Sequence, residues 1–262
     1  MKIIVCIKQV PATNRVGIDE STGVLKREGV ESKMNPYDLY ALETAIRLKE
    51  KTGGSVTTVT MGPPQAKSVI KESFILGADK GYIFSDRKFV GSDVLATAYT
   101  LSQGIRLLED FDLIICGKQT TDGDTAQVGP ELAEFLGIPH VTWVTKITAI
   151  TEEAIVVEQD LGNSYGILEL PFPSLITVEK EIFQPRLPSY RRKVQTAGKQ
   201  VNMFAFSNFI DHDDQKYGLN GSATQVERIF PPVAYKDQIF WEEQALVVAE
   251  KIYALIKDKN II

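Results

Sequence analysis

Short runs of apolar and β-branched residues alternate with longer amphipathic segments over the first 150 residues. The short runs predict buried strands at 2–8, 55–61, 81–84, 112–116 and 141–147. In the longer segments apolar positions recur every three to four residues, which predicts helices at 35–53, 64–76, 92–108 and 125–136. Strands that alternate with such helices need crossover connections, so we expect a doubly wound, mostly parallel α/β sheet covered on both faces.

The helix expected at 35–53 has the clearest local signals. Asn35 is a suitable N-cap, Pro36 fits the first helical position, and Asp38 complements the positive end of the helix dipole. Glycines at 53 and 54 end the helix. Residues 13–33, by contrast, are polar and rich in turn formers, so we expect a long loop or hairpin there.

The pattern changes near residue 150. Alternating residues at 154–159 and 165–169 around an LGN turn predict a hairpin, and 175–178 predicts one more strand. Residues 183–221 show no sustained period, whereas 242–257 have the pattern of an amphipathic helix. We therefore expect an α/β domain at 1–182 and an extended arm with a terminal helix at 183–262. The arm either embraces a partner or docks on its own domain, and composition favours neither.

Composition narrows the classes of function. The formal net charge of −5 argues against general binding of nucleic acid or of a membrane surface. Cys6 and Cys116 lie in apolar runs and are interpreted as buried, reduced strand residues. With two histidines and no Cys-x-x-Cys motif, we expect no metal site. The chain enters a strand at once, shows no targeting signal and has no membrane-length apolar run, so a cytoplasmic location is expected.

Candidate chemistry lies at the carboxyl ends of the predicted parallel strands, where open α/β sheets bind ligands. The most informative stretch is GKQTTDGDTAQVGP at 117–130, a loop of small and hydroxyl side chains that leads into a helix. Glycine and early helix amides suit phosphate oxygens, whereas Asp122 and Asp124 suit ribose hydroxyls or a helix cap. The stretch is neither a Walker loop nor a GxGxxG fingerprint, so a nucleotide-binding loop and an ordinary capped helix entry both stay open.

No residue pattern predicts a catalytic side chain. There is no G-x-S-x-G elbow, and neither His140 nor His212 lies near a nucleophile in the sequence. Lys8 and Lys118 lie at the ends of predicted strands, where each either contacts a phosphate or is simply solvated, and solvation is preferred.

Six motifs in a fixed order resemble the beta subunits of electron-transfer flavoproteins. They are IKQVP at 7–11, MNPYDLYALETAIRLKE at 34–50, MGPPQA at 61–66, LGADKGY at 76–82, GKQTTDGDTAQVGP at 117–130 and LGIPHVT at 136–142. LPFPSLITV at 170–178 and the PR pair at 185–186 fit the same family. The resemblance covers nearly the whole chain. It implies an adenine-nucleotide alpha hydrolase-like fold whose C-terminal arm wraps a larger alpha subunit.

The resemblance also implies a set of nucleotide-contacting positions, which coincide with the strand ends selected above. These positions are Cys6, Asn35, Pro36, Tyr37, Asp38, Met61, Asp122, Gly123, Asp124, Thr125, Ala126, Gln127, Val128, Gly129, Pro130, Glu131, Leu132 and Ala133.

Two branches of the family differ in the ligand at these positions. One holds AMP as a structural ligand, and the other holds a second FAD and uses it to bifurcate electrons from NADH. The DGDTAQVGP loop, with small Gly123, Thr125 and Ala126, resembles the bifurcating, anaerobic branch, because a larger ligand needs room. FAD is therefore preferred over AMP, and NAD is a further candidate ligand.

The function implied is NADH-dependent electron transfer, within a complex, to an acyl-CoA dehydrogenase or reductase-type flavoenzyme and to a low-potential acceptor such as ferredoxin. The alternative is a subunit that holds AMP and serves only assembly and docking. A free-standing nucleotide-binding protein is a third class, against which the C-terminal arm argues.

The segment FQPRLPSYRRK at 183–193 corresponds to the family loop that docks a dehydrogenase through an exposed leucine. Leu187 fits that role, and Tyr190 is the other candidate. Arg186 and Arg191 flank these side chains, which suits an acidic partner surface. An ordinary solvated basic loop is the alternative interpretation.

Overall fold

The computed structural model describes residues 1–12, 32–108, 110–227 and 239–259. The chain divides into two compact units, Met1–Glu227 and Arg228–Ile262. Most of the loop predicted at 13–33 lies outside the described residues. At its two ends, β2 (Gln9–Pro11) and β3 (Ser32–Met34) pair as a short antiparallel ladder.

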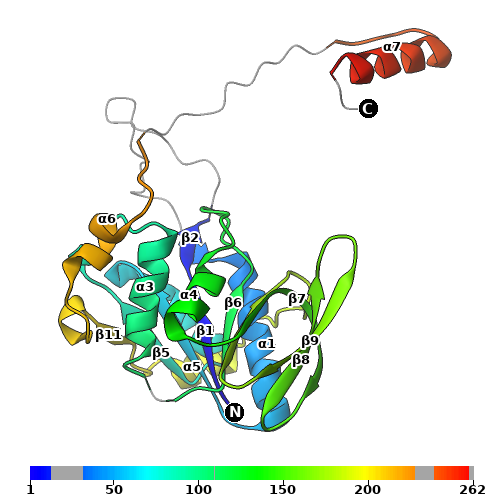
Figure 1. The fold of residues 1–262 in the computed structure, drawn as a ribbon. Helices are drawn as coiled ribbons and strands as arrows, with labels where there is room; N and C mark the ends of the chain where they lie inside the picture. Colours follow the sequence, from blue (N-terminus) through cyan, green and yellow to red (C-terminus); the bar gives the residue numbers. More distant parts are fainter. Residues whose placement is uncertain (13–31, 109, 228–238, 260–262) are drawn as a thin grey trace. The chain divides into compact units, whose positions relative to one another are not determined.

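A nine-stranded sheet forms the centre of the first unit (Figure 1), in the order β11-β5-β4-β1-β6-β10-β7-β8-β9. Neighbours from β11 to β7 are parallel, and β7-β8 and β8-β9 are antiparallel. The strands are β1 (Lys2–Cys6), β4 (Ser55–Met61), β5 (Lys80–Phe84), β6 (Leu113–Gly117), β7 (His140–Ile150), β8 (Ala154–Asp160), β9 (Tyr165–Pro171), β10 (Ser174–Val178) and β11 (Asn202–Phe204). The prediction of a mostly parallel sheet is confirmed.

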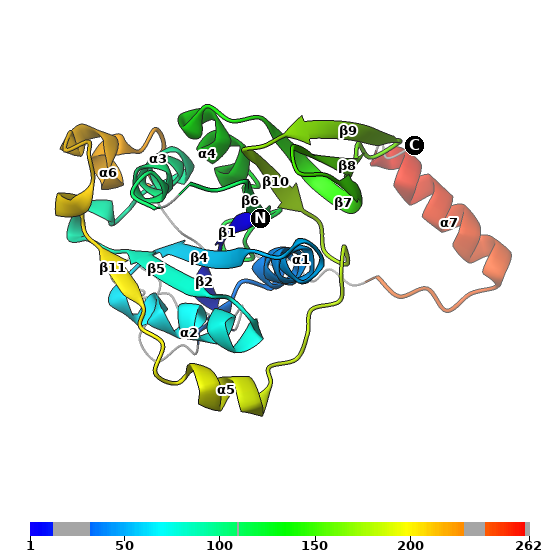
Figure 2. The same cartoon turned by 90° about the horizontal axis from the view of Figure 1, so that it is seen from below.

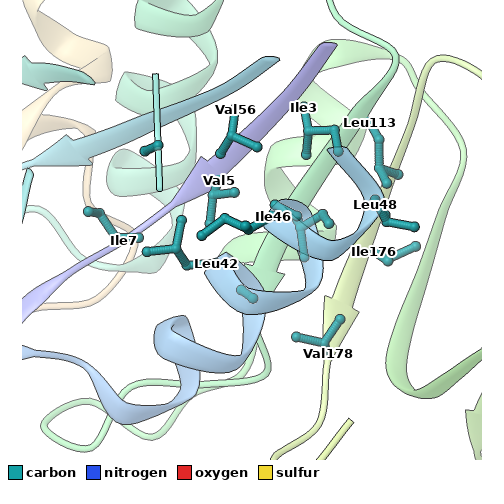
Figure 3. Packing of buried hydrophobic residues seen from close by; sticks show 14 of the residues in the cluster. Ile3, Val5, Ile7, Leu42, Ile46, Leu48, Val56, Leu113, Ile176 and Val178 are labelled. Carbon is teal, nitrogen blue, oxygen red and sulfur yellow. The ribbon is translucent and has the colours of Figure 1, made fainter. Parts of the chain in front are cut away.

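Helices cover both faces of this sheet, as Figure 2 shows end-on. On one face lie α1 (Pro36–Thr52) and α2 (Lys67–Leu76), and on the other lie α3 (Val94–Ile105) and α4 (Val128–Leu136). Successive strand residues point to opposite faces. Ile3 and Val5 therefore pack against Leu42 of α1 (Figure 3), whereas Ile4 packs with Leu132 of α4. The doubly wound arrangement gives the unit two apolar cores.

Most predicted elements begin and end within a few residues of the observed bounds. Gly53, at φ +80°, ends α1 and donates its amide to the Lys49 carbonyl oxygen at 2.8 Å. The segment 64–76 divides into the short η1 (Pro64–Ala66) and α2. Helix α3 begins later than predicted because the Asp93 carboxylate caps it, accepting the Ala96 amide at 3.1 Å. Helix α4 likewise begins at residue 128 rather than 125.

The segment from 183 to 227 belongs to the first unit and contains elements that no sequence period predicted. They are α5 (Tyr190–Thr196), β11, η3 (Phe206–Asn208), η4 (Asp214–Lys216) and α6 (Gly218–Gly221), with η2 (Arg87–Phe89) nearby. Helix α5 packs against α2, and β11 extends the sheet beside β5. The side chain of Tyr217 is buried among the rings of Phe89 and Phe209.

The second unit contains helix α7 (Ala245–Asp258), which matches the amphipathic helix predicted at 242–257. All of its residues are described, and none is buried. Across the described ranges, no helix has both the length and the apolar character that crossing a bilayer requires.

Candidate functional site

The winding of the sheet reverses between β1 and β6. From β1 the chain proceeds through α1, β4 and α2 to β5, and then returns through α3 to β6 on the other side of β1. In open sheets of this class, ligands bind in the crevice at the carboxyl ends of the strands where the order reverses. Cys6 ends β1 and Gly117 ends β6, so these strand ends form the edge at which the rule places a ligand, and this edge is called the crevice below.

Asn35 joins three segments at this crevice. Its fully buried side chain donates from Nδ2 to Asp38 Oδ1 and to the Gln119 carbonyl oxygen, both at 2.9 Å. Its Oδ1 accepts the Thr121 amide at 3.2 Å, and its own amide donates to the Lys8 carbonyl oxygen at 2.9 Å. Asn35 is the N-cap residue of α1, as expected, but its side chain makes no capping hydrogen bond because these other bonds occupy it. The residue holds the end of β1, the start of α1 and the loop after β6 together.

Asp38 carries a buried carboxyl group that is hydrogen-bonded to Asn35. Its Oδ2 accepts the Lys8 amide at 2.7 Å, and its Oδ1 accepts from Asn35. Burial raises the pKa of Asp38 from 3.8 to about 7, although the hydrogen bonds from Asn35 and Lys8 and the Lys8 charge act in the opposite direction. The crevice therefore contains a carboxyl group whose charge changes near neutral pH.

The two lysines at the strand ends make ion pairs, which corrects their interpretation as merely solvated. Lys8 Nζ lies 2.8 Å from Asp122 Oδ1. Burial alone would raise the pKa of Asp122, but the hydrogen bond and charge of Lys8 lower it below its usual value. Lys118 pairs with Glu179 at 2.5 Å, beside the ring of Trp143.

The loop from 118 to 127 has an unusual backbone. Asp124 and Ala126 have φ values of 55° and 56°, which are uncommon for residues other than glycine. Gly123 is not left-handed, so its small size matters here more than its conformational freedom. The Asp124 amide donates to the Thr120 carbonyl oxygen at 2.8 Å, and its carboxylate accepts from the Gln119 side chain. Strained residues of this kind concentrate at functional sites.

The loop leads into a helix whose first amides, Val128 and Gly129, have no hydrogen-bond partner among the described residues. Gln127, the N-cap of α4, makes no side-chain cap hydrogen bond. The first amides of a helix have no partner within it, and Pro130 has no amide hydrogen, so Val128 and Gly129 present theirs to the crevice. Gly129 packs so tightly on β10 that an added Cβ would lie 2.4 Å from Thr177 Cγ2. An uncapped helix N-terminus of this kind favours an anion.

Two buried polar atoms near the crevice have no hydrogen-bond partner. Among the described residues only three side chains contain such an atom, and two of them, Thr60 and Glu131, belong to the carboxyl end of β4 and the first turn of α4. Burial, together with the charge of Asp93, raises the pKa of Glu131. Buried polar atoms are nearly always satisfied in proteins, so the Glu131 carboxyl, in the first turn of α4, is a candidate contact for a bound group.

The two cysteines lie side by side at the base of the crevice. Cys6 and Cys116 face each other in the register of β1 and β6, and both are free thiols. Cys116 is buried and Cys6 partly so. The contact with Cys6, together with burial, raises the pKa of the Cys116 thiol well above its usual value.

The structure brings most of the predicted positions to one edge of the sheet. Tyr37 and Met61 are half-buried there, at the start of α1 and the end of β4. Leu132 and Ala133 instead have their side chains fully buried in the core beneath α4. The sequence analysis missed the role of Lys8. A signal for this role was present in the sequence: a lysine ends one predicted strand, and two aspartates follow another. Parallel strands end at the same edge of a sheet, so these side chains lie close together.

Gly117 sets the distance between α1 and β6, which leads to a first prediction. A Cβ added there would lie 2.5 Å from Asp38 Oδ1 and 2.7 Å from the Tyr37 carbonyl carbon. Gly117→Ala should therefore lower the free energy of unfolding by about 1–3 kcal/mol, measured by urea denaturation. Gly62→Ala is the control, since its Cβ would lie 3.5 Å from Ala66 Cβ, an ordinary contact. Equal midpoints for the two variants would contradict the close approach.

The fold is that of an open, doubly wound α/β protein, with a candidate ligand site at its topological switch point. Residues 22–206 match the family model described as the electron transfer flavoprotein domain. The chain is 45% identical over 226 residues to the electron transfer flavoprotein subunit beta of Thermoanaerobacterium thermosaccharolyticum, with 86% of each chain covered. It is 41% identical over 269 residues to the subunit of that name from Megasphaera elsdenii, with 97% of this chain and 98% of the relative covered.

A third relative carries a more specific name. The caffeyl-CoA reductase-Etf complex subunit CarD of Acetobacterium woodii is 39% identical over 264 residues, with 100% of both chains covered. The chain therefore belongs to the electron transfer flavoprotein beta subunit family, which confirms the resemblance seen in the sequence.

Proposed function

We propose that the crevice between β1 and β6 binds the adenosine diphosphate part of FAD. The chain would then be the nucleotide-holding beta subunit of a heterodimeric electron-transfer flavoprotein. The observation that carries this proposal is the uncapped first turn of α4, which stands at the switch-point crevice beside the loop held by Asn35.

The residues present fit such a group. The free amides of Val128 and Gly129 suit the diphosphate. Burial raises the pKa of Glu131, so its unpartnered carboxyl group stays neutral, and does not repel a phosphate, up to a higher pH than an ordinary glutamate. The Asp122 carboxylate suits ribose hydroxyls, and its pairing with Lys8 reduces its repulsion of the phosphates.

FAD, when bound, supplies the redox chemistry, whereas the chain binds and orients it. Asn35 fixes the loop against β1 and α1, which keeps the first turn of α4 at a constant distance from the crevice. Lys8 holds Asp122 in place. No side chain of this chain is assigned a catalytic role.

We further propose that the complex carries out NADH-dependent electron bifurcation. The recipients would be an acyl-CoA dehydrogenase or reductase-type flavoenzyme and a low-potential acceptor such as ferredoxin. Two observations support this proposal: the similarity to a subunit named for a caffeyl-CoA reductase-Etf complex, and the small side chains of the DGDTAQVGP loop, which leave room for a second flavin. NAD is a further candidate ligand.

The alternative is a crevice that holds AMP as a structural ligand. AMP uses the same amides and hydroxyl acceptors as the adenosine end of FAD, so the features of the crevice itself fit both. Under this alternative the chain serves assembly and partner docking only.

Identification of the released nucleotide separates the two. The chain, co-purified with its alpha subunit, is denatured, and the released nucleotides are identified by mass spectrometry and quantified by absorbance. Two FAD per heterodimer is the expected result. One FAD and one AMP would contradict bifurcation through this crevice, and the absence of any adenine nucleotide beyond one FAD would contradict the binding proposal.

The alpha subunit is also the proposed partner of the C-terminal arm. Helix α7 leaves Leu246, Ile252 and Tyr253 exposed and buries no residue, so its apolar side has no partner among the described residues of its own unit. An amphipathic helix in this state typically packs against another chain. We propose that residues 183–262 contribute to wrapping the alpha subunit.

The loop after β10 is the proposed docking site for the dehydrogenase. The Arg186 guanidinium binds Glu43 at 2.8 Å and Glu50 at 2.7 Å on α1, which anchors the loop. Arg192 also faces inward and donates to the Leu76 carbonyl oxygen at 2.7 Å. Leu187 and Tyr190 are left 89% and 81% exposed. The flanking Arg191 is exposed as well.

A second prediction follows for this loop. Leu187→Ala should raise the KM for the acyl-CoA dehydrogenase-type partner about tenfold, because an exposed apolar side chain is a typical anchor at an interface. The free energy of unfolding should change by less than about 0.5 kcal/mol, since the side chain contacts little of its own unit. Ile210→Ala, at a 72% exposed aliphatic residue elsewhere, is the control. Equal KM values for both variants and the parent protein would contradict the docking role proposed for Leu187.

A further inference from the structure

Trp143 has a backbone conformation that is rare for a bulky residue. Its φ is 58°, in the left-handed region, and its ring is 40% exposed. The pairing of β7 with β10 shifts register at this point, and the Trp143 amide donates to Thr177 Oγ1 at 3.0 Å. The surrounding strands therefore hold the residue in a conformation that costs free energy.

A one-residue β-bulge accounts for the backbone: it brings Val141 and Val144, three positions apart, to the same face of the sheet. Val141 and Val144, on either side of Trp143, belong to the core beneath α1, as Ile147 does at its edge. The Trp143 ring belongs to neither apolar cluster of the described residues. The bulge directs the Trp143 side chain out of the core and leaves it partly exposed, and bulges that re-aim a side chain in this way are common next to functional sites.

The position of Trp143 connects it to the crevice. Thr177, which accepts its amide, is also the residue on which Gly129 of α4 packs, so Trp143 is separated from the first turn of α4 by one side chain. Lys118, the first residue after β6, extends its ammonium group over the Trp143 ring at 4.4 Å from the centroid and pairs with Glu179. The ring thus lies at the same edge of the sheet as the proposed diphosphate site.

We infer that Trp143 is a stacking surface for the isoalloxazine ring of the bound dinucleotide and determines the preference of the crevice for FAD over AMP. This inference rests on the proposed function. Lys118 covers one face of the indole, and the exposed remainder of the ring is available to a planar ligand. AMP ends at its phosphate and lacks the ring that would reach Trp143. Stacking of a planar ligand on an aromatic side chain strengthens its binding about tenfold.

Affinity measurements on the nucleotide-free heterodimer, with the alpha-subunit FAD site filled first, provide the main test. Trp143→Ala should weaken binding of FAD about tenfold and leave the affinity for AMP unchanged, both measured by calorimetric titration. Trp143→Phe, which keeps an aromatic ring, should recover most of the FAD affinity. Equal weakening of FAD and AMP would assign the ring to the adenine end and overturn the inference, as would unchanged binding of both.

A spectroscopic measurement on the parent protein avoids any effect of the substitution on folding. The chain contains two tryptophans, so labelling with 5-fluorotryptophan gives two fluorine resonances, assigned with Trp143→Phe. FAD should shift the Trp143 resonance through the flavin ring current, AMP should not, and the Trp241 resonance serves as the internal reference. A Trp143 resonance that responds equally to FAD and AMP, or to neither, overturns the inference. Failure of the parent heterodimer to bind either nucleotide at the second site would overturn the proposed function itself.

Discussion

The contribution of Asp38 to the free energy of unfolding should fall by on the order of 4 kcal/mol as the pH rises from about 4 to about 7. Burial raises the pKa of Asp38 from 3.8 to about 7 in the folded chain. The folded state therefore binds this proton more tightly than the unfolded state does. The stabilisation is complete below the unfolded pKa and is lost as the pH rises through the folded pKa.

Comparison with Asp38→Asn isolates this contribution. The difference between the parent and the variant in unfolding free energy, measured in urea, should change by about 3 kcal/mol between pH 5 and pH 8. Asp112→Asn is the matched control, because Asp112 Oδ2 also accepts a backbone amide, that of Lys2 at 2.7 Å, but at the surface. A parent-to-Asp38→Asn difference that stays constant with pH would show that burial does not shift this group.

The same titration changes the charge of the proposed nucleotide site. Asp38 shares the crevice with the Lys8–Asp122 ion pair, and each of these two charged groups affects the pKa of Asp38. Above pH 7 the crevice gains a negative charge, which opposes a phosphate-bearing ligand. We therefore expect the second nucleotide to bind more tightly at pH 6 than at pH 8.

The parallel sheet could be predicted from sequence because its signals are local. The run from 55 to 61 is observed as β4 with the predicted bounds, since β-branched residues flanked by glycine have few other stable arrangements. Strand β11, at 202–204, escaped prediction for the opposite reason. It has three residues, and its partner β5 lies far earlier in the chain, so only the tertiary contact defines it.

The site was predictable in position but not in detail. The rule that ligands bind at the carboxyl ends of parallel strands placed Cys6 and the loop from 117 to 130 together without any motif. The ion pair between Lys8 and Asp122 joins residues 114 positions apart, and no local sequence pattern predicts it. The left-handed backbone conformations of Ala126 and Trp143 could not be predicted from the sequence either. Surrounding contacts impose them, whereas both residue types prefer negative φ values.

The hydrogen bonds of Asn35 show how one small side chain joins several segments of the crevice. It satisfies Asp38, the Gln119 carbonyl oxygen and the Thr121 amide at once, and these three groups belong to α1 and to the loop after β6. The loop after β6 is therefore tied to α1 by a residue that precedes it by more than 80 positions.

Asn35→Ala should accordingly lower the free energy of unfolding by roughly 3–5 kcal/mol, because up to three buried polar groups lose their partner. The second nucleotide should be absent from the purified heterodimer, since the loop that carries the first turn of α4 is no longer tied to α1. Urea denaturation and nucleotide analysis measure the two effects. Asn220→Ala, at an exposed asparagine, should change stability by less than about 0.5 kcal/mol.

The combination of outcomes identifies what Asn35 does. Loss of stability together with loss of the nucleotide is expected if one buried side chain both completes the fold and orders the ligand site. A stable variant that has lost its nucleotide would mean that the loop folds independently and that Asn35 contacts the ligand directly. A variant that keeps both stability and nucleotide would show that water replaces the amide, and the crevice would then be ordered by the Lys8–Asp122 ion pair, the other observed contact between β1 and this loop.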